Sequence, residues 1–189
     1  MIVKEKGLLR LMRGAYRGSG YTMMVDTIGG DEYLCMSHFG WMVGIEMGAV
    51  PRKVLAMLVE HLGKLPRYGE AFKVQKQAVQ SELFGVAREP FKDLLQCMDY
   101  WDSHKVMKRT KLEWNGCQVW QSIKDQSIVL LAPDMEDIGL YVENTHEVRL
   151  SGTQMMIQGE RSFAAIAKEY VEDGEKPLLE HLTEKQWVQ

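Results

Sequence analysis

The strongest constraint on the fold is a pair of two-residue turn signals, each placed between runs of β-forming residues. Asn115-Gly116 lies between TKLEW and CQVWQSI, and Gly29-Gly30 lies between GYTMMVDTI and DEYLCMSHF. Dipeptides of this kind accept positive φ angles, and the tight turn that results joins two antiparallel strands. The chain is therefore predicted to build antiparallel sheet from hairpins.

Further β-forming segments extend both hairpins. GWMVGIEMG is expected to add a third strand to the first hairpin, and SIVLLAP a third strand to the second. HEVRL and TQMMIQ, separated by Ser151-Gly152, predict another hairpin. Two segments stay ambiguous: residues 70–84 read as one or two strands, and RSFAAIAKEY as a strand or a helix.

Apolar residues at helical spacing predict the remaining elements. We expect a first helix over roughly residues 3–17, a second that begins at Pro51, a third that begins near Pro90, and a short acidic helix from Pro177. The predicted fold class is α+β, with antiparallel sheet built from hairpins and three to four packed helices. Residues 1–189 suit a single domain, and a subdivision near 85–90 is allowed but not required.

Charge and cysteine content exclude several protein classes. The formal net charge of −3 is too small for a polyanionic mimic of nucleic acid and has the wrong sign for a protein that coats DNA. Three widely spaced cysteines without a CxxC pair predict reduced thiols and neither a disulfide framework nor a cysteine zinc site. No apolar run approaches the length of a membrane span, and the N-terminus lacks a signal peptide, so we expect a cytoplasmic protein that does not enter membranes.

No reaction is spelled out by the sequence. The five histidines lack metal-ligand spacing, and neither a GxSxG elbow nor a phosphate-binding loop is present. We therefore predict no catalytic residues, no metal ligands and no cofactor. A small metal-dependent hydrolase remains an unfavoured alternative, which would use the acids of the first β region: Asp26, Asp31, Glu32 and Glu46.

Two basic segments are the candidate binding residues. The first helix carries cations at spacings of four, three and four residues, so they fall in one stripe; a second cluster follows the third helix. Such stripes bind phosphates or acidic protein surfaces, although a solvated helix face or favourable charges at a helix C-terminus would also explain them. The candidate residues are Lys6, Arg10, Arg13, Arg17, Lys105, Lys108, Arg109 and Lys111.

Three segments carry a resemblance to other proteins: KGLLRLMRGAYRGSGYT, VPRKVLAMLVEHLGKLP and NGCQVWQ. With them the chain resembles small accessory proteins carried by mobile elements and phages of gut Firmicutes, among them anti-CRISPR proteins that block a Cas9-type nuclease. The resemblance implies a protein without cofactor or catalysis that inhibits by occlusion. It assigns a role to no individual residue.

We accordingly expect a non-catalytic binding protein that docks on a larger protein, with a Cas9-type nuclease as the partner that the resemblance implies. Nucleic acid could be touched through the two basic segments. The alternative is an accessory protein of a mobile element that binds nucleic acid by itself, with an affinity that falls steeply with salt. The sequence leaves the oligomeric state open.

Overall fold

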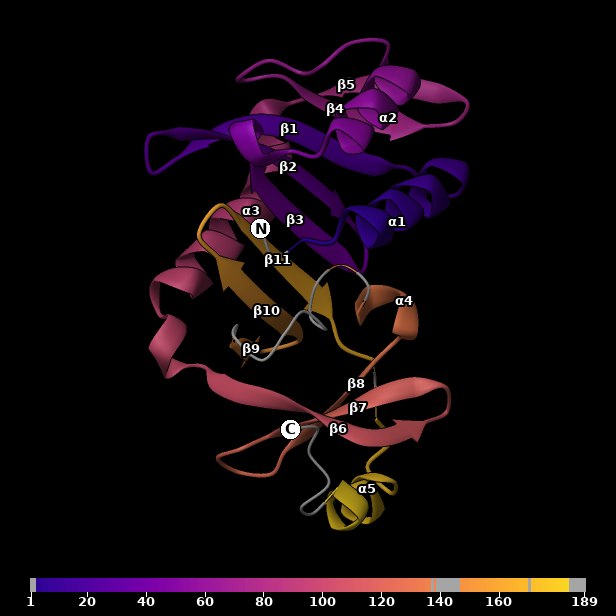
Figure 1. Ribbon diagram of the computed structural model, residues 1–189, viewed down its shortest axis with the longest axis vertical. Coiled ribbons are helices and arrows are strands. Elements are labelled where there is room, and N and C mark those ends of the chain that lie inside the picture. Colours follow the sequence, from indigo (N-terminus) through magenta and orange to yellow (C-terminus); the bar gives the residue numbers. More distant parts are fainter. Residues whose placement is uncertain (1–2, 137, 139–146, 170, 184–189) are drawn as a thin grey trace.

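The centre of the molecule is one antiparallel sheet of eleven strands (Figure 1). The computed structural model describes residues 3–136, 138, 147–169 and 171–183. The strands follow the spatial order β5-β4-β1-β2-β3-β11-β10-β9-β6-β7-β8. They are β1 (Tyr21–Ile28), β2 (Asp31–His38), β3 (Trp41–Glu46), β4 (Ala71–Gln75), β5 (Ala78–Glu82), β6 (Lys105–Trp114), β7 (Cys117–Ser122), β8 (Ile128–Leu131), β9 (Val148–Ser151), β10 (Gln154–Gly159) and β11 (Ser162–Ala167).

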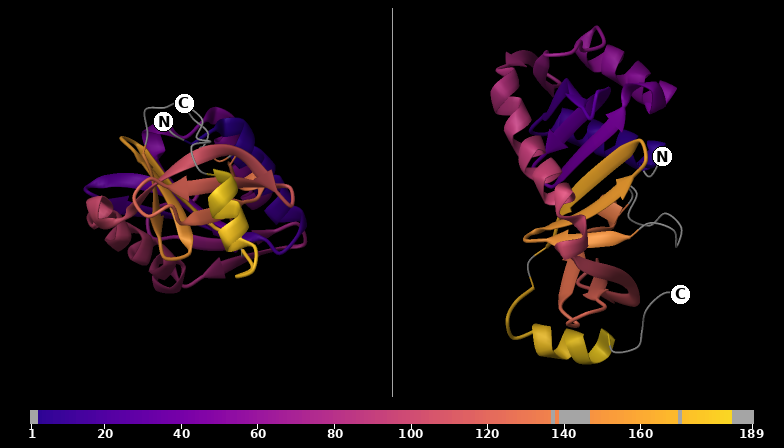
Figure 2. Two further views of the ribbon diagram at one scale, coloured as in Figure 1. Left: turned by 90° about the horizontal axis from the view of Figure 1, so that it is seen from below. Right: turned by 90° about the vertical axis from the view of Figure 1, so that its left-hand side faces the viewer.

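Helices cover both faces of this sheet (Figure 2). α1 and α2 pack on one face, and α3 packs on the opposite face, which α5 covers at the far end of the sheet. The helices are α1 (Glu5–Arg17), α2 (Arg52–Leu62), α3 (Phe84–Asp99), α4 (Pro133–Glu136) and α5 (Lys176–Thr183), with short 3-10 turns η1 (Met47–Ala49) and η2 (Trp101–Ser103).

The predicted mixture of helices with an antiparallel sheet is confirmed, although the sheet dominates and the helix number matches only roughly. Three helices have 11 to 16 residues, and α4 and α5 are shorter. The start predicted for the third helix was wrong, because α3 begins at Phe84 and Pro90 lies inside it. Ala87 is already buried together with Phe91 and Leu94, so packing on the sheet outweighs the hydrogen bond that the proline removes.

Both tight turns form as the sequence predicts. Asn115 and Gly116 have φ angles of 49° and 76°, and Gly29 and Gly30 have φ angles of 63° and 99°. Two consecutive positive φ angles are the requirement of a type I′ turn, whose twist matches that of the strands it joins. The ambiguous segments are strands: residues 70–84 contain β4 and β5, and RSFAAIAKEY contains β11.

The two halves of the chain repeat one order of elements. In the first half, α1 precedes the meander β1-β2-β3, and after α2 the strand β4 pairs with β1. In the second half, α3 precedes the meander β6-β7-β8, and after α4 the strand β9 pairs with β6. The halves join where β3 pairs with β11. We call this pairing the seam.

The strand alternation sends apolar side chains to both faces of the sheet. One core lies under α1 and α2 and includes Leu8, Met12 and Trp41, while a second core lies between the sheet and α3 and includes Met24 and Phe91. None of the helices in the described parts of the chain combines the length and apolarity needed to cross a membrane.

Candidate functional site

The basic residues of the first helix occupy the outer side of α1. The opposite side of the helix is anchored by Leu8, Leu9, Met12 and Ala15, all buried against the sheet and α2. At 100° per residue the basic positions span an arc of roughly 60°. All four side chains are exposed, and we call them the cationic face: Lys6, Arg10, Arg13 and Arg17.

Helix electrostatics explain only one end of the cationic face. Arg17 lies in the last turn of α1, where a cation is favoured by the helix dipole. Lys6 lies in the first turn, where the same dipole disfavours a cation. Like charges at these spacings also destabilise an isolated helix by roughly 0.2–0.5 kcal/mol per pair. The stability of the helix therefore does not explain why these four cations lie in one stripe.

Internal carboxylates do not neutralise most of this face. Glu5, the acid of the first turn, forms an ion pair with Lys53 of α2 at 3.2 Å. Within the described residues no ion pair is formed by Lys6, Arg13 or Arg17. Their positive charge is thus presented to the outside of the molecule.

A stack of partly buried Tyr16 on buried His61 fixes α1 against α2. The ring of Tyr16 lies parallel to that of His61 with centroids 3.7 Å apart, and the Tyr21 hydroxyl lies 2.9 Å from His61 Nδ1. Burial raises the pKa of Tyr21, so its hydroxyl stays protonated in this hydrogen bond with the imidazole. Burial also lowers the pKa of His61, with the nearby Arg13 acting in the same direction and Glu60 against it. His61 is therefore a neutral packing residue at neutral pH.

The second basic segment lies on β6, and its side chains alternate between the faces of the sheet. Lys105 forms an ion pair with Asp125 at 2.5 Å, which holds the pKa of that carboxyl well below its usual range. Arg109 Nε lies 3.3 Å from Glu136 Oε1. Lys108 and Lys111 are exposed. The four residues therefore do not form one continuous surface.

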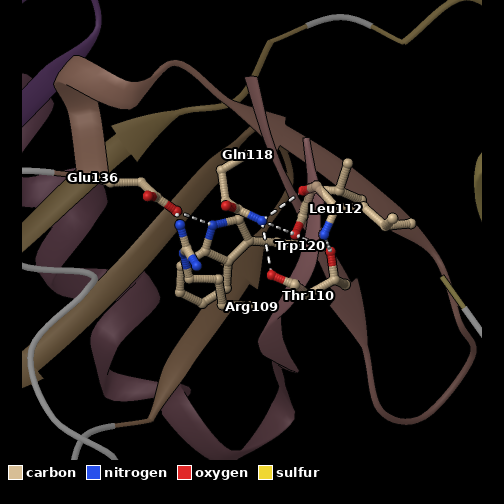
Figure 3. Close-up of polar contacts among 7 residues, drawn as sticks. Arg109, Thr110, Leu112, Gln118, Trp120 and Glu136 are labelled. Carbon is tan, nitrogen blue, oxygen red and sulfur yellow. Dashed lines mark hydrogen bonds and ion pairs between the residues drawn. The ribbon is translucent and has the colours of Figure 1, made fainter. Parts of the chain in front are cut away.

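Arg109 belongs to a buried polar cluster, drawn in Figure 3. The carboxylate of Glu136 in α4 also accepts a hydrogen bond from Trp120 Nε1 at 2.7 Å. The pairing of β6 with β7 shifts register after Arg109. At this shift the Gln118 side-chain amide donates hydrogen bonds to the carbonyl oxygens of Thr110 and Leu112, at 2.9 and 2.7 Å. The role of Arg109 in this place is to hold α4 on the sheet.

The structure separates the two basic segments along the sheet. α1 contacts α2, β1 and β4, whereas β6 lies on the far side of the seam, with five strands between it and β1 in the sheet order (Figure 1). The two basic segments therefore do not form one flat surface that a partner could cover.

The acids considered for hydrolysis are partly engaged in ion pairs. Asp26 is buried and lies 2.5 Å from Arg88 Nε, and Glu46 is held by both Nε and Nη2 of Arg161 at 2.7 Å. Asp31 and Glu32 are exposed beside the hairpin turn. In the described parts of the chain, no three His, Cys, Asp or Glu side chains come together as metal ligands would.

One hollow was not foreseen from the sequence. It lies on the α3 face of the sheet and has a volume of about 350 Å³. Its lining comes from β1, β2, β3, β4, β10, β11 and α3, segments that only the strand order brings together. The one local signal is the Phe39-Gly40 turn, which carries an aromatic ring where a turn usually has polar residues.

No family model matches the chain, and no curated protein matches it in sequence.

Proposed function

We propose that the protein acts by binding, without catalysis, and that the cationic face of α1 docks on an acidic surface of a larger partner. The observation that carries the proposal is the exposure of all four cations of the stripe on a helix whose other side is buried. Arginine guanidinium groups grip carboxylates or phosphates with two hydrogen bonds at once, so a row of them suits an anionic surface.

The mechanism that follows is occlusion. A helix of 13 residues that lies on a partner blocks whatever that surface would otherwise bind. The resemblance to anti-CRISPR proteins makes a Cas9-type nuclease the first partner to test, and such a partner would place the protein in the cytoplasm. An inhibitor of this kind needs no cofactor.

The test is charge reversal with a matched control. Arg10→Glu, Arg13→Glu and Arg17→Glu together should weaken binding to a guide-loaded Cas9-type nuclease by roughly tenfold or more, measured by surface plasmon resonance. The melting temperature should stay nearly unchanged, because these side chains are exposed. The control is Lys92→Glu, Lys124→Glu and Lys168→Glu, which alters net charge equally at exposed positions outside both basic segments.

The outcomes of these binding measurements separate a docking role from a structural one. Selective loss with the α1 set supports the proposal, and equal loss with both sets reduces it to a general charge effect. Unfolding of the α1 variant, or binding as tight as that of the wild type, makes the cationic face structural. A parallel gel-shift series with short DNA at low and physiological salt detects an affinity for nucleic acid alone, which would favour the mobile-element alternative.

A further inference from the structure

The hollow on the α3 face lies beside α3, and we call it the groove. α3 packs over one row of neighbouring side chains, among them Met24, Cys35 and Phe163. The next row, two residues along each strand, lines the hollow at the edge of α3, and its Met42 and Ala165 still belong to the core that α3 covers. A volume of about 350 Å³ is within the range of small-molecule sites.

The floor changes from polar to apolar across five strands. Strand pairing places Lys73 beside Thr22, Thr22 beside Ser37, Ser37 beside Met42, and Met42 beside Ala165. The β4 end thus offers an ammonium group and two hydroxyl groups, and the β11 end offers buried apolar surface. This gradient matches a ligand that is itself polar at one end.

An exposed aromatic residue stands at the rim. Phe39 is 87% exposed, and its ring and that of His38 form a T-shaped pair with centroids 5.2 Å apart. The His38 ring is held in turn by a 2.8 Å hydrogen bond between its Nε2 and Ser19 Oγ. A large apolar side chain left in water beside an apolar floor gains buried area when a ligand lies between them.

The charged residues differ between the two ends of the groove. Lys73 is exposed and forms no ion pair with any described residue. At the other end, a second hollow that shares Met42 and Pro90 with the first is lined by the acids Glu89 and Asp93 of α3. An anionic head is attracted to the Lys73 end and repelled from the α3 acids.

We propose that this groove binds a small anionic amphiphile, with its acidic head at Lys73 and the hydroxyl groups of Thr22 and Ser37, and its apolar body over Met42 and Ala165 beneath Phe39. The site is on the face opposite to α1 and is independent of the proposed docking surface. Its ligand class is defined by one negative charge and an apolar body.

Decanoate is the probe, and isothermal titration calorimetry of the full-length protein is the measurement. Wild type should bind one decanoate per chain, and bind decylamine and decanol more weakly. Lys73→Met should weaken decanoate binding roughly tenfold, because a charge-assisted hydrogen bond is lost, while decanol binding is retained. Lys108→Met, which removes an exposed lysine from β6, should leave decanoate binding unchanged.

A second variant tests the apolar end. Ala167 lines the hollow and is only partly buried, so Ala167→Phe should fill the groove and abolish binding of both decanoate and decanol without unfolding the sheet. Absence of saturable decanoate binding to wild type overturns the proposal. So does equal affinity of the wild type and both groove variants, provided that their melting temperatures show them to be folded.

Discussion

The seam between the two halves of the sheet contains a glycine whose replacement should be costly. Gly44 of β3 lies opposite Phe163 of β11, and the ring of Phe163 covers the glycine. A Cβ atom added to Gly44 would stand well under 3.0 Å from three ring carbons, closer than real Cβ atoms approach. Because Phe163 is buried under α3 and stacks on Tyr33, its ring has little room to withdraw.

The expected effect of Gly44→Ala follows from two opposing contributions. Overpacking of a well-packed core costs about 1–3 kcal/mol. Removal of glycine from a strand returns about 0.5–1 kcal/mol through the lower entropy of the unfolded chain. The free energy of unfolding should therefore fall by about 1–2 kcal/mol, and the melting temperature of a chain of this length by roughly 2–8 °C.

Urea unfolding of a double-mutant cycle measures the effect. In a Phe163→Leu background the smaller side chain leaves space, so Gly44→Ala should become nearly neutral, with a coupling energy of about 1 kcal/mol or more. Gly14→Ala is the control, because a Cβ at this exposed position in α1 meets nothing within 4 Å and should stabilise the protein by up to about 1 kcal/mol. A neutral Gly44→Ala, or one equally costly in both backgrounds, would refute the steric reasoning.

Three further predictions concern polar groups, two of them buried and one exposed. Burial lowers the pKa of His61, so the folded protein binds fewer protons than the unfolded chain as the pH falls through the ordinary histidine range. The melting temperature should thus drop from about pH 7.5 to about pH 5.5, and drop less in His61→Gln; equal slopes would contradict this. Glu136→Ala should cost about 2–4 kcal/mol in urea unfolding, because it leaves the Trp120 indole N–H buried without an acceptor. Lys105→Met should cost less than about 1 kcal/mol, since its pair with Asp125 is exposed, and similar losses in the two variants would show that burial does not set the cost.

Local patterns in the sequence were sufficient to predict most of the individual helices and strands. The hairpin at Asn115-Gly116 and the amphipathic helix α1 depend on residues within one or two turns of each other, so their signals survive in any tertiary context. The predicted start of the helix around Pro90 is wrong because a proline normally opens a helix, and only the packing of Ala87 against the sheet reveals the earlier turns.

The candidate site was accessible to sequence reasoning only where it lies on one element. Exposure of the stripe on α1 follows from helical geometry alone. Arg109, by contrast, pairs with Glu136, and Lys105 pairs with Asp125. Both acids are at least 20 residues away in the sequence, so no local pattern predicts these ion pairs. The groove depends on pairings such as that of Met42 with Ala165, residues that no local pattern connects.

The seam explains why the groove exists at all. Its polar end, with Lys73 and Thr22, belongs to the first half of the chain, and its apolar end, with Ala165 and Ala167, belongs to β11 of the second half. Gly44 and Phe163 occupy the adjacent row of the same strand pair, under α3. A small residue opposite a ring lets the two strands and the helix pack closely there, while the small side chains of β11 one row further leave the space unfilled. The joining of two similar halves therefore creates a concave surface that neither half contains by itself.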